Sequence, residues 1–139
     1  MTASTKGSTL SHGEHPSATL IRRGVEAFRR GDAAWIRQHV VDDIIWHVGG
    51  STPLSGIYRG KDEVLDFMSR EREGMAAVNA EMEIGDVLAN DDHVVLLGTM
   101  SADLPDGRRT RSKYVQVFHV SDEKVHQVWE AEMWRMVES

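Results

Sequence analysis

Cysteine is absent from this chain of 139 residues. Its absence excludes disulfide bonds, thiolate nucleophiles and sulfur-ligated metal centres. Long apolar runs are missing too. No segment approaches the roughly 18 consecutive apolar residues of a membrane-spanning helix, and the first fifteen residues lack the apolar core of a secretory signal. We therefore expect a cytoplasmic protein without a membrane partner.

Positive charge is also scarce. The chain has 16 Lys and Arg residues against 22 Asp and Glu residues, for a formal net charge of −6. This balance disfavours an extended contact with a phosphate backbone. The one basic cluster, at residues 108–113, follows a turn signal, and we interpret it as a solvated hairpin arm. No nucleic-acid partner is predicted.

Several motifs that carry cofactor or hydrolase chemistry do not occur. Neither Gly-x-Gly-x-x-Gly nor Gly-Lys-Ser/Thr is found, and the Gly-Gly-Ser-Thr-Pro run at 49–53 lacks the lysine of a phosphate loop. The absence of Gly-x-Ser-x-Gly and His-Glu-x-x-His argues against a serine or zinc hydrolase. His12 and His15 lack a third, rigidly held ligand, so they predict no metal site. We predict that the protein uses no cofactor.

The length suits one domain, which at this size buries roughly 70% of the surface that the unfolded chain exposes. We expect two parts: a flexible tail, residues 1–15, and a single domain, residues 16–139. Apolar residues recur at helical spacing from Pro16 until Gly31, which predicts an amphipathic helix with a glycine stop. Asp32 is suited to cap a short second helix. A third helix is expected over 61–73, where apolar and charged residues take opposite sides.

The pattern changes beyond Gly74. Four long apolar runs follow, separated by compact polar breaks of hairpin length, at 76–88, 93–104, 110–120 and 124–136. This spacing predicts an antiparallel meander. The runs are longer than usual strands, so we expect bends, with Gly85 and Gly98 as the candidates. Together with a strand over 43–48, the pattern predicts an α+β domain with helices on one face of a strongly curved sheet.

The strand over 43–48 carries His47 and leads into an irregular Gly/Pro loop. Because side chains alternate along a strand, His47 shares one face with Ile45, and Trp46 takes the other. Both faces are mostly apolar, so we expect both to be covered. A buried imidazole needs hydrogen-bond partners or a wet cavity. His47 is therefore a candidate pocket residue, with a structural histidine bonded to the backbone as the alternative.

This order of elements, together with the segment WHVGGSTPLSGIYRG at 46–60, resembles the SnoaL-like branch of the nuclear transport factor 2-like superfamily over residues 17–136. The resemblance implies a cone-shaped, cystatin-like α+β barrel whose curved antiparallel sheet wraps on N-terminal helices. It also implies a deep, largely apolar pocket and a homodimer packed through the outer face of the sheet. The superfamily includes polyketide cyclases, ketosteroid isomerases, epoxide hydrolase-like enzymes, dehydratases and non-catalytic binders, so the fold does not fix the reaction.

The resemblance also suggests roles for single residues. Counted back from Ser55, His47 falls where ketosteroid isomerases carry their catalytic carboxylate base. Gln116 falls near the position of their oxyanion-stabilising acid, and Gly24 replaces their oxyanion tyrosine. This departure counts against ketosteroid isomerase activity itself, because the donors that would hold an enolate are largely missing.

The late strands add further candidates. Tyr114, Gln116 and Phe118 alternate onto one face, which suits a pocket wall that orients a ligand, although an internally satisfied Gln116 is the alternative. In the last strand Glu130 and Glu132 share a face. If that face looks into the cone, one carboxylate would project towards His47, and the pair could divide acid and base roles. Which glutamate faces the pocket stays open, and a solvated strand end is the alternative.

The sequence thus favours a cofactor-independent enzyme for acid/base isomerisation, cyclisation or epoxide opening of a small, largely apolar substrate. Its predicted catalytic residues are His47, Glu130 and Glu132. Its predicted substrate-binding residues are Trp46, Tyr58, Phe67, Tyr114, Gln116, Phe118 and Trp134. Among these, Trp46 and Tyr58 could instead complete the core. The rival hypothesis is a non-catalytic ligand-binding or scaffolding homodimer with the same pocket.

Overall fold

A computed structural model describes residues 14–138. The helices are α1 (Pro16–Arg30), α2 (Ala33–His39) and α3 (Lys61–Ala77). The strands are β1 (Val40–Val48), β2 (Gly56–Arg59), β3 (Glu81–Ala89), β4 (His93–Asp103), β5 (Arg109–Ser121) and β6 (Lys124–Glu138). Most of the predicted tail, and His12 with it, lies outside the described residues. None of the described helices is long and apolar enough to cross a membrane.

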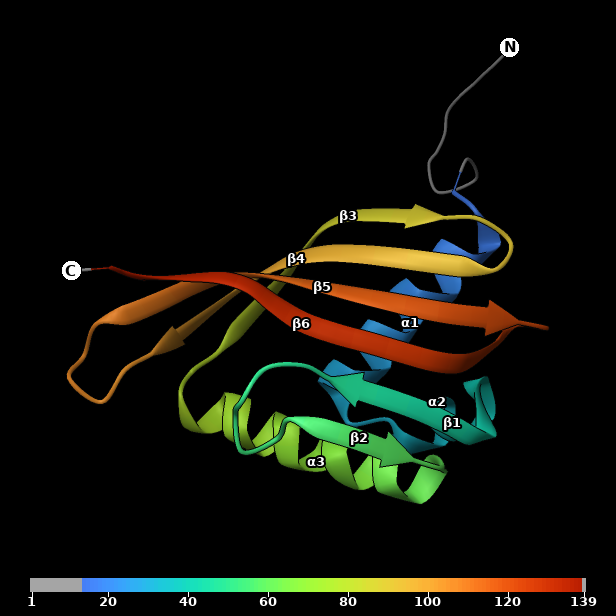
Figure 1. Cartoon of the computed structure of the whole chain (residues 1–139), viewed down its shortest axis with the longest axis horizontal. Helices are drawn as coiled ribbons and strands as arrows, with labels where there is room; N and C mark the ends of the chain where they lie inside the picture. The colour runs from blue at the N-terminus through green and yellow to red at the C-terminus, as the bar shows by residue number, and fades with distance from the viewer. Residues whose placement is uncertain (1–13, 139) are drawn as a thin grey trace, which may run out of the picture.

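All six strands form one curved sheet in the order β2-β1-β6-β5-β4-β3, and the helices lie on one side of it (Figure 1). The predicted α+β fold with a curved sheet is therefore confirmed. One detail differs from the expected antiparallel sheet, because β1 runs parallel to β6 while every other neighbouring pair is antiparallel. The sheet is mixed, and the parallel pair lies near its middle.

Helices α1 and α2 begin where the sequence predicts, and α1 also ends at its predicted glycine. The His15 ring accepts a hydrogen bond of 3.1 Å from the Ser17 amide at the start of α1. Gly31 ends α1 with a φ of 70°, a left-handed conformation that glycine adopts at little cost. The Asp32 carboxylate then accepts a hydrogen bond of 3.0 Å from the Trp35 amide and caps α2.

Three boundaries differ from the prediction. Strand β1 begins at Val40, whereas the strand was predicted over 43–48. Helix α3 continues through Gly74 to Ala77, so the following strand starts at Glu81 and not at residue 76. The stretch after the 49–55 loop was expected to be irregular, yet β2 (Gly56–Arg59) pairs with β1. A strand of four residues is too short for its periodicity to stand out in the sequence.

The two glycines predicted to bend the sheet behave differently. The pairing of β3 with β4 slips between Ile84 and Asp86, so Gly85 is the extra residue of a β-bulge, as predicted. Gly98 stays in register opposite Tyr114 and forms no bulge. A Cβ atom at Gly98 would overlap the Tyr114 ring, so glycine is required there by the close approach of that ring.

Strand β6 contains two further slips, which decide the side to which its residues turn. Its pairing with β5 leaves His126 and Met133 without partners, because the register shifts beside each of them. Between the two slips, β6 alternates regularly, with Val128 fully buried and Trp129 exposed. Glu130 falls on the same side as Val128, which is the side that the helices cover.

The core lies between the sheet and the helices. Its largest fully buried side chains are Phe67, Ile44, Leu96, Val64, Val94 and Val128. Trp46 packs against this core, with its ring centre 5.9 Å from Phe67 and 6.4 Å from Phe118. The core fills one part of the space under the curved sheet, and a cavity occupies another.

Candidate active site in the cavity

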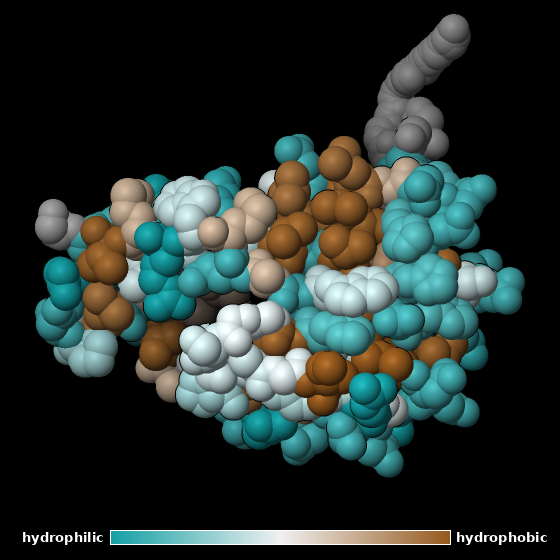
Figure 2. Space-filling view, viewed as in Figure 1, coloured by the Kyte–Doolittle hydropathy of each residue, from teal (hydrophilic) through white to brown (hydrophobic). Residues whose placement is uncertain are grey.

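A cavity of about 270 Å³ lies between the concave face of the sheet and the helices. Its wall is mostly apolar and includes four methionines from α3, β3 and β4, namely Met68, Met75, Met82 and Met100. Figure 2 shows a hollow in the surface between the C-terminal part of β6 and the loop that joins β1 to β2, where Gly49, Thr52 and Glu132 line the cavity. A flexible, apolar wall of this kind suits a small apolar ligand.

Glu130 turns from β6 into this cavity. Its Oε1 atom accepts a hydrogen bond of 2.6 Å from the Trp46 indole and one of 3.4 Å from the Gln116 amide. Gln116 lies directly opposite Glu130 in the pairing of β5 with β6, so three adjacent strands hold this carboxyl group. Burial raises the pKa of Glu130, while the two hydrogen bonds act in the opposite direction.

A second carboxyl group, Glu71, faces the same cavity from α3. It lies between Met68 and Met75, which also line the cavity. Burial, and then the charge of Glu130, raise the pKa of Glu71 to about 8. With a pKa of about 8, Glu71 holds a proton near neutral pH beside the Glu130 carboxyl group.

Sequence reasoning missed Glu71. The signal that could have found it is its spacing in the third helix, because Phe67, Glu71 and Met75 recur every four residues and therefore lie on one face. An acidic residue on the apolar face of an amphipathic helix either faces a cavity or has a buried partner.

Tyr114 brings a phenol to the cavity. Its ring lies against Gly98, and its buried hydroxyl has no hydrogen-bond partner among the described residues. Burial raises the pKa of Tyr114 to about 12, and the charges of Glu130 and Glu71 act in the same direction against that of Arg29. The phenol therefore stays neutral near neutral pH.

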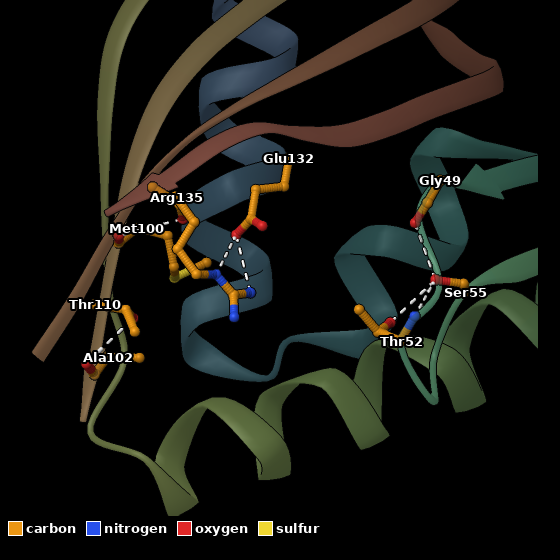
Figure 3. Close-up of polar contacts among 9 residues, drawn as sticks. Gly49, Thr52, Ser55, Met100, Ala102, Thr110, Glu132 and Arg135 are labelled. Atoms are coloured by element: carbon orange, nitrogen blue, oxygen red, sulfur yellow. Dashed lines mark hydrogen bonds and ion pairs between the residues drawn. The ribbon is translucent and has the colours of Figure 1, made fainter. Parts of the chain in front are cut away.

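Glu132 also lines the cavity, but it is engaged by a cation. Its Oε2 atom accepts hydrogen bonds of 3.1 and 3.2 Å from Arg135 (Figure 3). On the other side of the opening, the Ser55 hydroxyl donates to the Gly49 carbonyl at 3.0 Å and accepts from the Thr52 amide at 2.8 Å (Figure 3). These contacts fix the rim of the cavity. Within residues 14–138, Glu71 and Glu130 are then the two cavity carboxyl groups without a cationic partner.

His47 does not share the cavity with the glutamates, so its predicted contact with them is wrong. Its Nε2 atom lies 3.3 Å from Oε1 of Gln127, and its ring stacks on Trp129 at 5.3 Å with an interplanar angle of 4°. The alternation predicted for this strand is present, but Trp46 takes the inward side and His47 the outward one. Trp46 fits there because its indole fills the core and also reaches Glu130.

The other predicted residues divide into two groups. Those that line the cavity are Trp46, Tyr114, Gln116, Phe118, Glu130 and Glu132. Three do not. Phe67 is fully buried in the core, and Tyr58 stacks on it at 4.5 Å. Trp134 follows the bulge at Met133, pairs with Lys113, and is 46% exposed. Within residues 14–138, no cluster of three or more His, Asp or Glu side chains could hold a metal ion.

Comparison with known proteins agrees with this architecture. Residues 21–128 match the family model of the SnoaL-like domain. The chain belongs to the SnoaL-like domain family. Its curated relatives include the uncharacterized protein Rv0034 of Mycobacterium tuberculosis and the uncharacterized protein Mb0035 of Mycobacterium bovis, each 35% identical over 79 residues. This match covers 55% of the SnoaL-like chain and 58% of each relative, so it spans less than two thirds of their length.

Solved structures share the fold of this SnoaL-like protein. A protein with a cystatin-like fold from Xanthomonas campestris superposes with a TM-score of 0.72 at 20% identity, covering 86% of this chain and 92% of its own. An NTF2-like protein from Burkholderia xenovorans superposes with a TM-score of 0.68 at 19% identity, and the match covers 88% of both chains. IdmH from Streptomyces antibioticus, a candidate polyketide cyclase, superposes with a TM-score of 0.67 at 18% identity. The match covers 86% of this chain and 93% of IdmH. At these identities the likeness shows the fold alone.

Proposed function

We propose that this SnoaL-like protein is a cofactor-independent enzyme that moves protons on a small, largely apolar molecule, with Glu130 and Glu71 as the acid/base pair. The observation that carries the proposal is the placement of both carboxyl groups in one apolar cavity, close enough for the charge of Glu130 to raise the pKa of Glu71. Titratable groups with raised pKa values in a cavity are characteristic of acid/base sites.

The environments of the two groups suggest different roles. Glu130 accepts hydrogen bonds from Trp46 and Gln116, and these favour its ionised form. Glu71 has a pKa of about 8, so it holds a proton near neutral pH. Glu130 would then take a proton from an acidic C–H of the substrate, and Glu71 would return one at another atom. The net result is an isomerisation, or a ring closure or opening, without a cofactor.

Tyr114 supports the same chemistry. Its side chain lines the cavity with the two glutamates, and its hydroxyl, which is buried against Gly98, stays protonated up to a pH of about 12, where its pKa lies. A neutral phenol in a buried site can donate to the oxygen on which negative charge develops when a C–H next to a carbonyl loses its proton. Tyr114 is therefore the proposed oxyanion donor, in place of the missing tyrosine at Gly24.

The test follows exchange of the α-hydrogens of small cyclic ketones, such as cyclohexanone and indanone, with D₂O by NMR. The wild-type protein should accelerate exchange, and Glu130→Gln should reduce that acceleration by about 100-fold or more. Glu73→Gln is the matched control, because it removes the same charge from an exposed position of α3. Binding of the ketones without accelerated exchange would favour the non-catalytic rival. Acceleration that survives both Glu130→Gln and Glu71→Gln would refute the role of the pair.

We also propose that two copies pair through the outer face of the sheet. Two tryptophans of β6 support this: Trp129 is 38% exposed and Trp134 is 46% exposed, and both turn away from the cavity. Exposed tryptophans on one sheet face are costly unless another surface covers them. In analytical ultracentrifugation, the double change of Trp129→Glu and Trp134→Glu should give a monomer. Val78→Glu, at a similarly exposed apolar residue beyond α3, should leave the dimer intact.

A further inference from the structure

We infer that the cavity selects ligands that carry a positively charged nitrogen on an apolar body. This inference rests on the same carboxyl pair as the proposed function, but it concerns a ligand that competes with the substrate, because a bound ammonium group would displace the proton that Glu71 holds. The charges around the cavity support the inference. Three carboxyl groups line it, Glu71, Glu130 and Glu132, and none of the lining residues in the described chain is a lysine or arginine. Of the three, Glu132 alone has a cationic partner among the described residues, namely Arg135.

The other charged or titratable groups near the cavity are already engaged. His39 lies in the wall, where its Nδ1 atom is 2.7 Å from the Trp35 carbonyl and its ring stacks on the Trp35 indole at 3.9 Å. Arg29 influences Tyr114 through its charge, but its guanidinium binds Glu26 at 2.8 Å and the Met82 carbonyl at 2.6 Å. Neither residue neutralises the carboxyl pair.

The pair therefore has two ways to avoid buried negative charge. In the free protein it retains a proton, which agrees with the raised pKa of both Glu71 and Glu130. An ammonium group placed between the two carboxyl groups would supply the missing positive charge and would allow both to ionise. A neutral ligand offers no such compensation, and an anionic ligand would add to the repulsion.

The neighbouring side chains also suit a cation. Trp46, Tyr114 and Phe118 line the cavity beside the carboxyl pair, and the faces of aromatic rings attract ammonium groups. The methionine side chains of the wall adapt to an apolar body of varied shape. The cavity, at about 270 Å³, limits that body to the size of a small molecule.

Three probes of one shape and different charge test the inference: phenylpropylamine, phenylpropanol and phenylpropanoate. Isothermal titration calorimetry of the full chain at neutral pH, in phosphate and in Tris, gives each Kd and the number of protons released. We expect the amine to bind at least about tenfold more tightly than the alcohol, with release of a fraction of a proton up to one, and the acid to bind most weakly. Alcohol binding as tight as that of the amine would overturn the inference, as would no amine binding at millimolar concentration.

Two variants test whether the preference for the amine depends on Glu71. Glu71→Gln should remove most of the preference for the amine over the alcohol and abolish proton release, whereas the exposed Glu73→Gln should change neither. The wild-type comparison among probes stands without the variants, so a poorly folded variant leaves the inference testable. A result that refutes the cationic ligand can also be distinguished from one that refutes the proposed enzyme activity. Ketone exchange that depends on Glu130, combined with no preference for the amine, would keep the enzyme proposal and refute the cationic ligand.

Discussion

The Trp46 indole donates a hydrogen bond of 2.6 Å to the Glu130 carboxylate across the parallel pair β1 and β6. Trp46 is at the same time a core residue, 6% exposed and packed between Phe67 and Phe118. The position of the carboxylate is therefore coupled to the packing of the core. A group held in this way can keep its direction while a ligand enters or leaves.

Trp46→Phe tests this coupling. The ring still fills most of the space, but Glu130 loses its closest donor, so its ionised form is less stable. We expect the pKa of Glu130 to rise further above its ordinary value and the protein to lose about 1–3 kcal/mol of stability. NMR titration of ¹³C-labelled glutamate side chains measures the first effect, and urea unfolding the second. Trp129→Phe, on the outer face, should leave the titration of Glu130 unchanged, and an equal effect of both changes would contradict the assigned contact.

Glu71 should make the protein less stable as the pH rises. Its pKa is raised from 4.5 to about 8, so the folded protein binds this proton more tightly than the unfolded chain does. The stabilising effect of that proton is fully present below pH 4.5 and is lost as the pH rises to about 8. Glu71→Gln removes the contribution of Glu71 to this pH dependence. We expect the variant to be more stable than the wild type by about 2 kcal/mol in alkaline buffer, with a smaller difference in acid.

Urea unfolding at several pH values measures this difference. Glu73→Gln serves as control, because it removes an exposed charge from the same helix. It should shift stability little and equally at all pH values. A wild-type protein and a Glu71→Gln variant with parallel stability profiles would show that Glu71 is not held protonated.

His47 and Trp46 show which part of the candidate site could be predicted from the sequence and which part could not. Alternation along the strand placed the two residues on opposite faces, as observed, but both faces were apolar, and the pattern did not tell which one the helices cover. Glu130 was a candidate together with Glu132, on the condition that their shared face looks into the cone. The same alternation failed for Trp134, because the bulge at Met133 reverses the sides beyond it. A bulge without a glycine leaves no clear mark in the sequence.

Gly98→Ala should be strongly destabilising. A methyl group there would overlap the Tyr114 ring, which would have to move from its place in the cavity wall. We expect a loss of about 1–3 kcal/mol, as for other overpacked sites, together with weaker binding of any ligand that uses the phenol. The control is Gly74→Ala in α3, where a methyl group meets no other atom within 4 Å. That change should stabilise the helix by about 0.5–1 kcal/mol. Thermal or urea unfolding compares the two, and equal effects would contradict the close approach of Tyr114.

His47→Gln should leave the chemistry of the cavity intact. The ring lies on the outer face, where it contacts Gln127 and stacks on Trp129, so its loss should cost about 1 kcal/mol or less in stability. Ketone exchange and the binding of phenylpropylamine should match the wild type, because neither Glu71 nor Glu130 depends on this ring. Gln116→Leu is the contrasting change, since it removes a donor to Glu130 and should raise the pKa of that group. A loss of exchange in His47→Gln with the fold intact would return the histidine to the catalytic role and displace the carboxyl pair.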